Sequence, residues 1–183
     1  MRNLEGTTNN DTEPDFNKSA HWQKLTRSVE HITDAVGKPI DEGIKDTVIA
    51  MMAHELSTSQ SCEGHINTQD NTHNMPFVEI YAPEPEGWQN DQEKKEQWTR
   101  KNLEQQSKTI DYLDEFYENR TTPFSTMLNI RPIGMYGGFR LQSAGSDIAL
   151  LLQSTQLHDK FIAYQKEMQE FTQFLKDKYF TQQ

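Results

Sequence analysis

Apolar side chains recur at spacings of three and four residues in four stretches of the chain, as they do on one face of an α-helix. The first stretch runs from Trp22 to Val36, with Ser19 as a suitable N-cap and Gly37 as a stop signal. The last stretch, which ends near Tyr179, is the most regular of the four. The spacing predicts helices over residues 20–36, 42–55, 90–120 and 159–180.

Short runs of β-prone residues lie between these helices, and glycine, proline or polar turns bound them. The runs predict four strands, over residues 58–61, 77–81, 126–132 and 138–143. Between the last two, Ile133-Gly134-Met135-Tyr136-Gly137 predicts a hairpin turn and lacks the lysine and hydroxyl of a phosphate-binding loop. The polar residues 67–76 predict a loop. Residues 147–156 fit either a helix or a buried strand.

The order of these elements predicts an α+β fold, in which about four helices pack on a small, mostly antiparallel sheet. The helices include a long central one and a C-terminal one. A chain of 183 residues has the usual size of one domain. We expect a single domain over residues 18–183, preceded over residues 1–17 by a polar, disordered arm without periodicity.

The charge balance narrows the choice of partners. The chain has 28 acidic and 18 basic residues, and its net charge of −10 disfavours nucleic acid as a partner. No apolar run approaches the roughly 18 residues of a membrane helix, so we expect no membrane partner. A single cysteine and a start without an apolar signal segment predict a cytoplasmic protein.

The candidate site centres on Cys62, the only cysteine. Glu63 and His65 follow it within three residues, and Gly64 between them allows a sharp turn. Glu79 lies inside a predicted strand, where an acid needs a partner or solvent, and Arg140 lies on a neighbouring strand. We expect Arg140 to pair with the Glu63 carboxylate. The prediction is a cleft that binds a small polar ligand and is lined by Ser61, Cys62, Glu63, His65, Glu79 and Arg140.

Two other interpretations of Cys62 stay open, and a third is a metal ligand. The thiol could be a nucleophile with His65 as its base, or a plain buried side chain. Cys62 and His65 also have the C-x-x-H spacing of zinc ligands, but no second tight pair accompanies them, so we predict no metal. The sequence leaves the cofactor unknown. Whether the protein is an enzyme therefore stays open.

The stretches around residues 37–44, 58–65 and 77–80 resemble a family of uncharacterised bacterial proteins with a Ser-Cys-Glu-Gly-His motif. Similar sequences occur among mobile integron gene cassettes, so the resemblance implies an accessory or adaptive role. The motif is also similar to the Ser-Cys-x-Gly-Arg motif of the wybutosine-synthesis tRNA methyltransferase family. His65 stands where that family has arginine. That likeness implies an enzyme using Cys62 or an S-adenosylmethionine-type cofactor.

The helix predicted over residues 90–120 suggests an alternative function. Its first half is highly charged, and Trp98, Leu103 and Ile110 are too few for a deep core. We expect this helix to meet another subunit, so that the chain forms a homo-oligomer, in the simplest case a homodimer. A protein-interaction module that uses this charged helix is the alternative to ligand binding.

Overall fold

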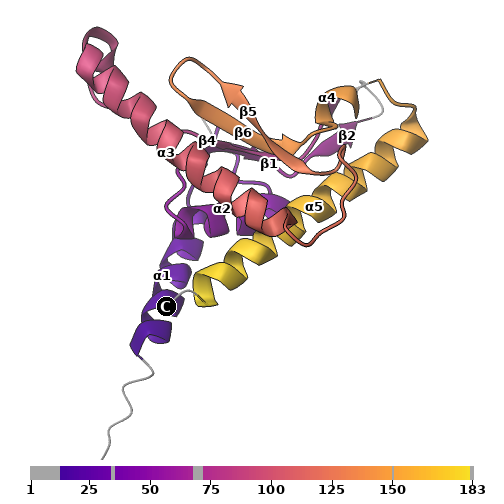
Figure 1. The fold of residues 1–183 in the computed structure, drawn as a ribbon, viewed down its shortest axis with the longest axis horizontal. Helices are drawn as coiled ribbons and strands as arrows, with labels where there is room; N and C mark the ends of the chain where they lie inside the picture. The colour runs from indigo at the N-terminus through magenta and orange to yellow at the C-terminus, as the bar shows by residue number, and fades with distance from the viewer. Residues whose placement is uncertain (1–12, 34–35, 68–71, 150, 182–183) are drawn as a thin grey trace, which may run out of the picture.

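The computed structural model describes residues 13–33, 36–67, 72–149 and 151–181. Figure 1 shows how the elements follow one another. In chain order they are α1 (Glu13–Val29), α2 (Glu42–Ala53), β1 (Thr58–Cys62), β2 (His65–Asn67), β3 (Thr72–Asn74), β4 (Phe77–Ile80), the 3-10 turn η1 (Trp88–Asn90), α3 (Gln92–Tyr117), β5 (Leu128–Ile133), β6 (Gly138–Ser143), α4 (Ser146–Ala149) and α5 (Ser154–Thr181). This arrangement confirms the α+β prediction.

Four strands form an antiparallel sheet in the order β1-β4-β6-β5. All four lie where the β-prone runs predicted them, and β5 and β6 form the predicted hairpin. Gly134 and Gly137 both have positive φ in its turn, a conformation that glycine adopts without strain.

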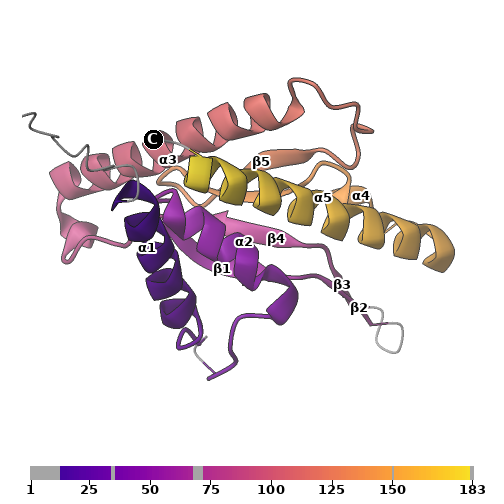
Figure 2. The same ribbon diagram turned by 90° about the horizontal axis from the view of Figure 1, so that it is seen from below.

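The core lies on one face of this sheet. Apolar residues at alternate positions of β4, β5 and β6 face α2, α3 and α5, which cover that side together (Figure 2). Phe139, Leu141 and Phe171 are fully buried there. The other face of the sheet carries polar residues, among them Glu79 and Arg140.

The first helix differs from the prediction at both ends. It begins at Glu13, so Ser19 lies inside it, and residues 13–17 of the expected arm are helical. The rest of that arm, residues 1–12, lies outside the described residues. The helix ends at Val29, which packs against α2, whereas Ile32 and Val36 are exposed. After the helix, Thr33 bridges to Pro39, so the chain turns back earlier than the apolar spacing suggested.

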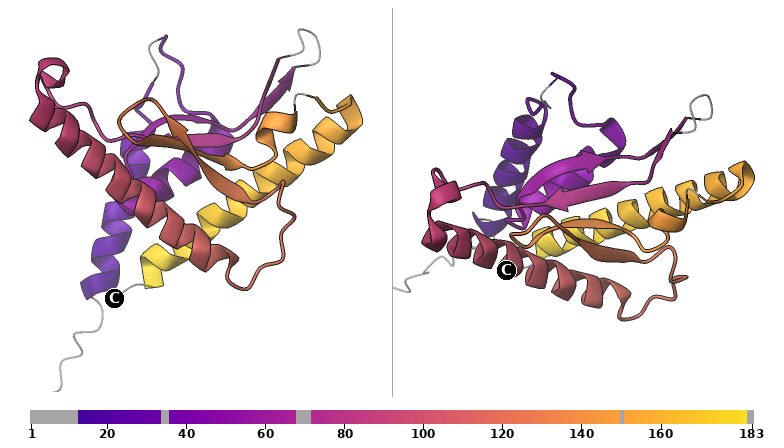
Figure 3. Two further views of the ribbon diagram at one scale, coloured as in Figure 1. Left: turned by 45° about the horizontal axis from the view of Figure 1, so that its top comes forward. Right: turned by 90° about the horizontal axis from the view of Figure 1, so that it is seen from above.

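The expected loop 67–76 is wrong at residue 67 and at residues 72–74, which belong to strands. β2 and β3 pair as a two-stranded ribbon, with His65 opposite Asn74. Only Glu63 and Gly64 separate β1 from β2, so the ribbon continues from the ends of β1 and β4 (Figure 3). Its polar side chains hid the strand signal. Residues 68–71 of that expected loop lie outside the described residues.

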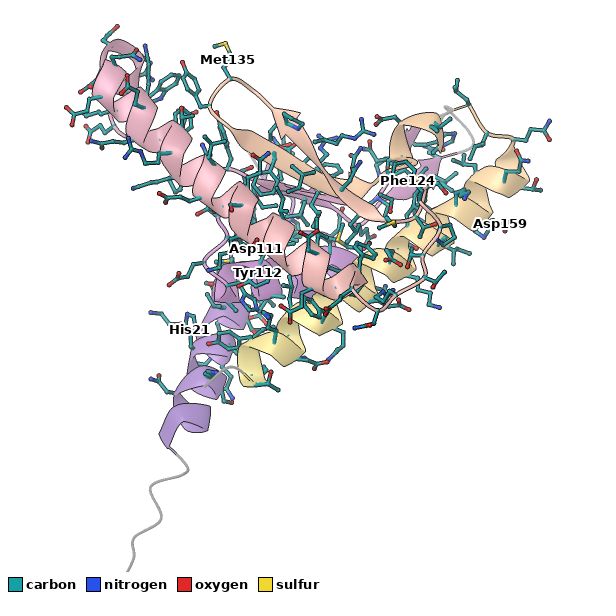
Figure 4. The ribbon with its side chains drawn as sticks, viewed as in Figure 1. His21, Asp111, Tyr112, Phe124, Met135 and Asp159 are labelled. Carbon is teal, nitrogen blue, oxygen red and sulfur yellow. The ribbon has the colours of Figure 1, made fainter. Side chains whose placement is uncertain are left out.

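The segment after β6 contains two helices. It begins with the short α4, and α5 starts at Ser154, earlier than predicted, with Leu157 buried in its first turns. The C-terminal end of α5 lies beside α1, where His21 Nδ1 lies 2.7 Å from the Tyr179 hydroxyl oxygen. Figure 4 labels His21 on α1 and Asp159 near the other end of α5. No helix in the described part of the chain has the length and apolar character needed to span a bilayer.

Candidate functional site

The strand register places several predicted site residues on the polar face of the sheet. Cys62 lies opposite Phe77, and Glu79 lies opposite Arg140. Directly opposed residues and residues two apart on a strand project on the same side. These four residues therefore share one side, while Val78 between Phe77 and Glu79 faces the core. We call this side the open face, because α2, α3 and α5 cover the other one (Figure 3).

Glu79 and Arg140 form the centre of the open face. Arg140 donates to Glu79 Oε1 from Nε at 3.0 Å and from Nη2 at 2.5 Å. Its guanidinium carbon lies 3.9 Å from the centre of the Phe77 ring. Glu79 is only 8% exposed, and a carboxylate so buried needs such a partner. The pairing with Arg140 thus explains why an acidic residue, Glu79, lies inside this strand. The expected pairing of Arg140 with Glu63 is wrong.

A second ion pair lies beside the first. Arg131 is directly opposite Arg140 on β5, and two like charges so placed repel unless each has a counter-ion. Asp147 of α4 supplies one, with 2.5 Å between its Oδ2 and Arg131 Nη1, and it also accepts from Gln142. Within the described residues, Asn129 Oδ1 and Arg131 Nε are buried without a hydrogen bond. The sequence did not predict Arg131 and Asp147 as part of this site, because only the pairing of β5 with β6 brings them next to Arg140.

Cys62 and His65 lie at the end of the open face. The Sγ of Cys62 lies 3.9 Å from His65 Nδ1 and accepts from the Gly64 N–H at 3.3 Å. Burial raises the pKa of the Cys62 thiol above its ordinary value, and the nearby Asp41 carboxylate raises it further, against the lowering effect of the Gly64 N–H. A raised thiol pKa leaves little thiolate at neutral pH, which disfavours a nucleophile.

Glu63 points away from the other candidates. Its Oε2 accepts from the Gly43 N–H at 2.7 Å, at the beginning of α2. Its backbone carbonyl accepts from Gln165 of α5 at 3.1 Å. A carboxylate at a helix N-terminus is favoured by the unsatisfied N–H groups and the helix dipole. Glu63 therefore ties α2 and α5 to the end of β1 and takes no part in the open face.

Ser61 belongs to a third place. It lines a cavity of about 490 Å³ between β1 and the α1–α2 connection, together with neighbouring β1 residues. Lys38 and Asp41, 2.7 Å apart, lie on the other side of this cavity. The six predicted residues thus separate: Cys62, His65, Glu79 and Arg140 along the open face and its end, Glu63 toward α2, and Ser61 in the cavity beside β1.

Neither a ligand cluster among the described residues nor the comparisons with known proteins assign a role to these groups. Among the described residues, no cluster of three or more His, Cys, Asp or Glu side chains is placed to hold a metal ion. Comparisons of the chain with protein-family models, with curated proteins and with solved structures find no match.

Proposed function

We propose that this protein binds a small polar ligand on the open face, at the Glu79–Arg140 pair, without transforming it. The observation that carries the proposal is that the Glu79–Arg140 ion pair leaves one nitrogen of Arg140 and one oxygen of Glu79 without a hydrogen bond to other described residues. Both donating nitrogens of Arg140 bind the same oxygen of Glu79. Arg140 Nη1 and Glu79 Oε2 have no hydrogen bond to other described residues, and they lie on the side that the three core helices leave uncovered.

The two unused atoms define the ligand class. Arg140 Nη1 suits a carboxylate or phosphate oxygen, and Glu79 Oε2 suits an ammonium or N–H donor. A ligand with both groups, such as an amino acid, satisfies them together. A polyanion fits less well, because the chain carries a net charge of −10.

Binding without chemistry agrees with the state of Cys62. Its thiol has a raised pKa, and 3.9 Å separates it from the nearest imidazole nitrogen of His65. An enzyme using Cys62 or an S-adenosylmethionine-type cofactor is the alternative. We also propose an accessory role in the cytoplasm, because residues 58–65 resemble the motif of integron cassette proteins.

Thermal unfolding in the presence of defined probes tests the proposal. Amino acids, inorganic phosphate and nucleosides are added separately at millimolar concentration, and the unfolding temperature is compared with that of the free protein. We expect amino acids to raise it. The double variant Glu79→Gln with Arg140→Gln should lose this increase, because it keeps a neutral hydrogen-bonding pair and removes both charges.

A matched control lies elsewhere on the molecule. Arg120 pairs with Glu167 and Glu170 between the end of α3 and α5, away from the open face. Arg120→Gln should be less stable than the wild type and should keep the full ligand response. Equal responses in the Glu79/Arg140 double variant and the wild type would overturn the proposed site, as would no response to any amino acid.

The long helix supports a second candidate function, as a protein-binding surface. Leu103 and Ile110 on α3 are 49% and 44% exposed, although each is a large apolar residue on a regular helix. They lie seven residues apart, so they project from the same side of the helix. An assembly through this side, in the simplest case a homodimer, would cover both.

A further inference from the structure

The α3 helix carries two stripes of residues, one buried and one exposed. The buried stripe packs on the rest of the molecule and consists of Trp98, Asn102, Thr109, Tyr112, Leu113 and Phe116. The outer stripe consists of exposed residues at spacings of three and four: Arg100, Leu103, Ser107, Ile110 and Asp114. At 100° per residue the centres of the two stripes lie about 150° apart around the helix, and Leu103 lies at the edge of the outer stripe that borders the β5–β6 turn at Gly137. Such spacing is the pattern of a helix that packs on a second helix along this seam.

The order of residues in the outer stripe is what selects a partner. A cation lies at one end, an anion at the other, two apolar residues lie between them, and the small Ser107 is at the centre. Arg100 and Asp114 make no ion pair with other described residues. Fourteen residues separate them, about 21 Å along the helix, so they cannot pair with each other. An identical stripe running in the opposite direction matches cation to anion at both ends.

We propose that a second copy of this chain binds the outer stripe, with the two α3 helices antiparallel about a two-fold axis beside Ser107. Arg100 then faces Asp114 of the partner subunit, and Leu103 packs near Ile110 of the partner subunit. The contact is isologous, because the same patch serves both subunits. Ser107 has a small side chain, which lets the two helices approach closely at the axis. This inference rests on the second candidate function, the use of α3 as a protein-binding surface.

The neighbouring charges limit how the helices cross. Glu104 and Asp111 are exposed on one side of the stripe, about a quarter turn from Leu103 and Ile110. Two copies of this acidic side would repel. The closest approach therefore lies on the side of Leu103 and Ile110. Each subunit also has a net charge of −10, and the repulsion between two such subunits opposes dimerisation at low salt. At physiological salt the Debye length is only about 8 Å, so this repulsion is screened and the dimer is more stable than at low salt.

Charge reversal with rescue tests the arrangement. Sedimentation equilibrium of the full chain measures the dimer dissociation constant for the wild type, Arg100→Asp, Asp114→Arg and the double variant with both changes. Each single change creates two like-charge contacts in a symmetric dimer, and we expect dissociation constants roughly tenfold higher. The double variant restores opposite charges and should return to near the wild-type value. Arg27→Asp on the exposed side of α1 is the control and should leave dimerisation unchanged.

The possible results distinguish the antiparallel dimer from the more general proposal that α3 is a protein-binding surface. A wild-type chain that stays monomeric up to high concentration overturns the second copy as the partner, and leaves α3 open to another protein. A dimer that responds to Leu103→Gln with Ile110→Gln, and shows no rescue by the double charge reversal, overturns the antiparallel arrangement. A dimer indifferent to all of these changes overturns the α3 surface as well.

Discussion

The Nδ1 atom of His54 lies 2.9 Å from the hydroxyl oxygen of Tyr112, inside the layer where α2 meets α3. On the other side of the ring, Nε2 lies 2.8 Å from the carbonyl oxygen of Leu175 on α5. A carbonyl only accepts, so Nε2 carries the proton and Nδ1 accepts from Tyr112. One neutral imidazole, only 5% exposed, thus connects three helices.

This geometry predicts a loss of stability in mild acid. Burial lowers the pKa of His54 below its ordinary value of 6.5, because the folded site excludes the charged form. The unfolded chain therefore takes up the proton first. The contribution of His54 to the free energy of unfolding is fully present above pH 6.5. It decreases by up to about 1.4 kcal/mol per pH unit as the pH falls from 6.5 toward the lower pKa of the folded state. Urea unfolding between pH 8 and pH 5 measures the slope.

The variant His54→Gln isolates the contribution of the imidazole. Its amide can still donate to Leu175, and it does not titrate. We expect lower stability than the wild type at pH 8 and a smaller loss between pH 7 and pH 5. An unchanged slope in this variant would assign the acid sensitivity to other groups.

Gly64 and Gly37 form a natural pair for a backbone experiment. Both have left-handed backbone conformations, with φ of 86° and 82°. A Cβ on Gly64 would lie 2.7 Å from Phe161 Cε2 and 2.9 Å from Pro76 Cδ, whereas a Cβ on Gly37 would meet nothing within 4 Å. Gly37→Ala should cost about 1 kcal/mol from backbone strain alone.

Gly64→Ala should cost about 2–4 kcal/mol, because the crowding adds to the same strain. Chemical denaturation of both variants measures the difference. Equal losses would mean that the β1–β2 turn moves away from Phe161 at no cost, and that the close approach of α5 to this turn is not needed for stability.

Asn102 joins α3 to two loops, and this predicts a specific sensitivity to charge. The side chain is fully buried, its Oδ1 accepts from the Ala82 N–H at 2.6 Å, and its Nδ2 donates to the Tyr136 carbonyl at 2.8 Å. Asn102→Asp keeps the shape and replaces the donor with a carboxylate oxygen facing that carbonyl. We expect a loss of about 3 kcal/mol at pH 8.

The loss should be smaller at pH 5, because the protonated carboxylic acid regains a donor. Comparing the variant with the wild type at each pH removes the contribution of His54. Asn90→Asp, an exposed position in η1, is the control and should change stability by less than about 0.5 kcal/mol. A pH-independent loss in Asn102→Asp would show that the turn around Tyr136 rearranges.

The fold could be predicted from the sequence because its helices and strands each bury one side. The apolar spacing of α5 and the alternation in β4 directly reflect the core that they cover. The β2–β3 ribbon lacks such a signal, because its side chains are mostly polar. The end of α1 was misplaced because Ile32 and Val36 continue the helical spacing although they are exposed.

The site was harder to predict, because strand register is a property of pairs. The sequence placed Glu79 and Arg140 on neighbouring strands, but only the register of β4 and β6 makes them opposite. Glu63 has the same residue type and lies beside Cys62, yet the turn at Gly64 directs it to the start of α2. Neither fact follows from spacing along one segment.

The last prediction concerns the reactivity of Cys62. The thiol is 8% exposed and its pKa is raised by burial and by Asp41. We expect labelling by a thiol reagent at pH 8 to be at least about tenfold slower than for an unstructured peptide thiol, and to become fast in urea.

Asp41→Asn removes the nearby negative charge and should speed labelling a few-fold. His65→Ala should change the rate by less than about twofold, because 3.9 Å separates the imidazole from Sγ. Fast labelling of the native protein that depends on His65 would contradict this view of a structural thiol and would favour the enzyme alternative.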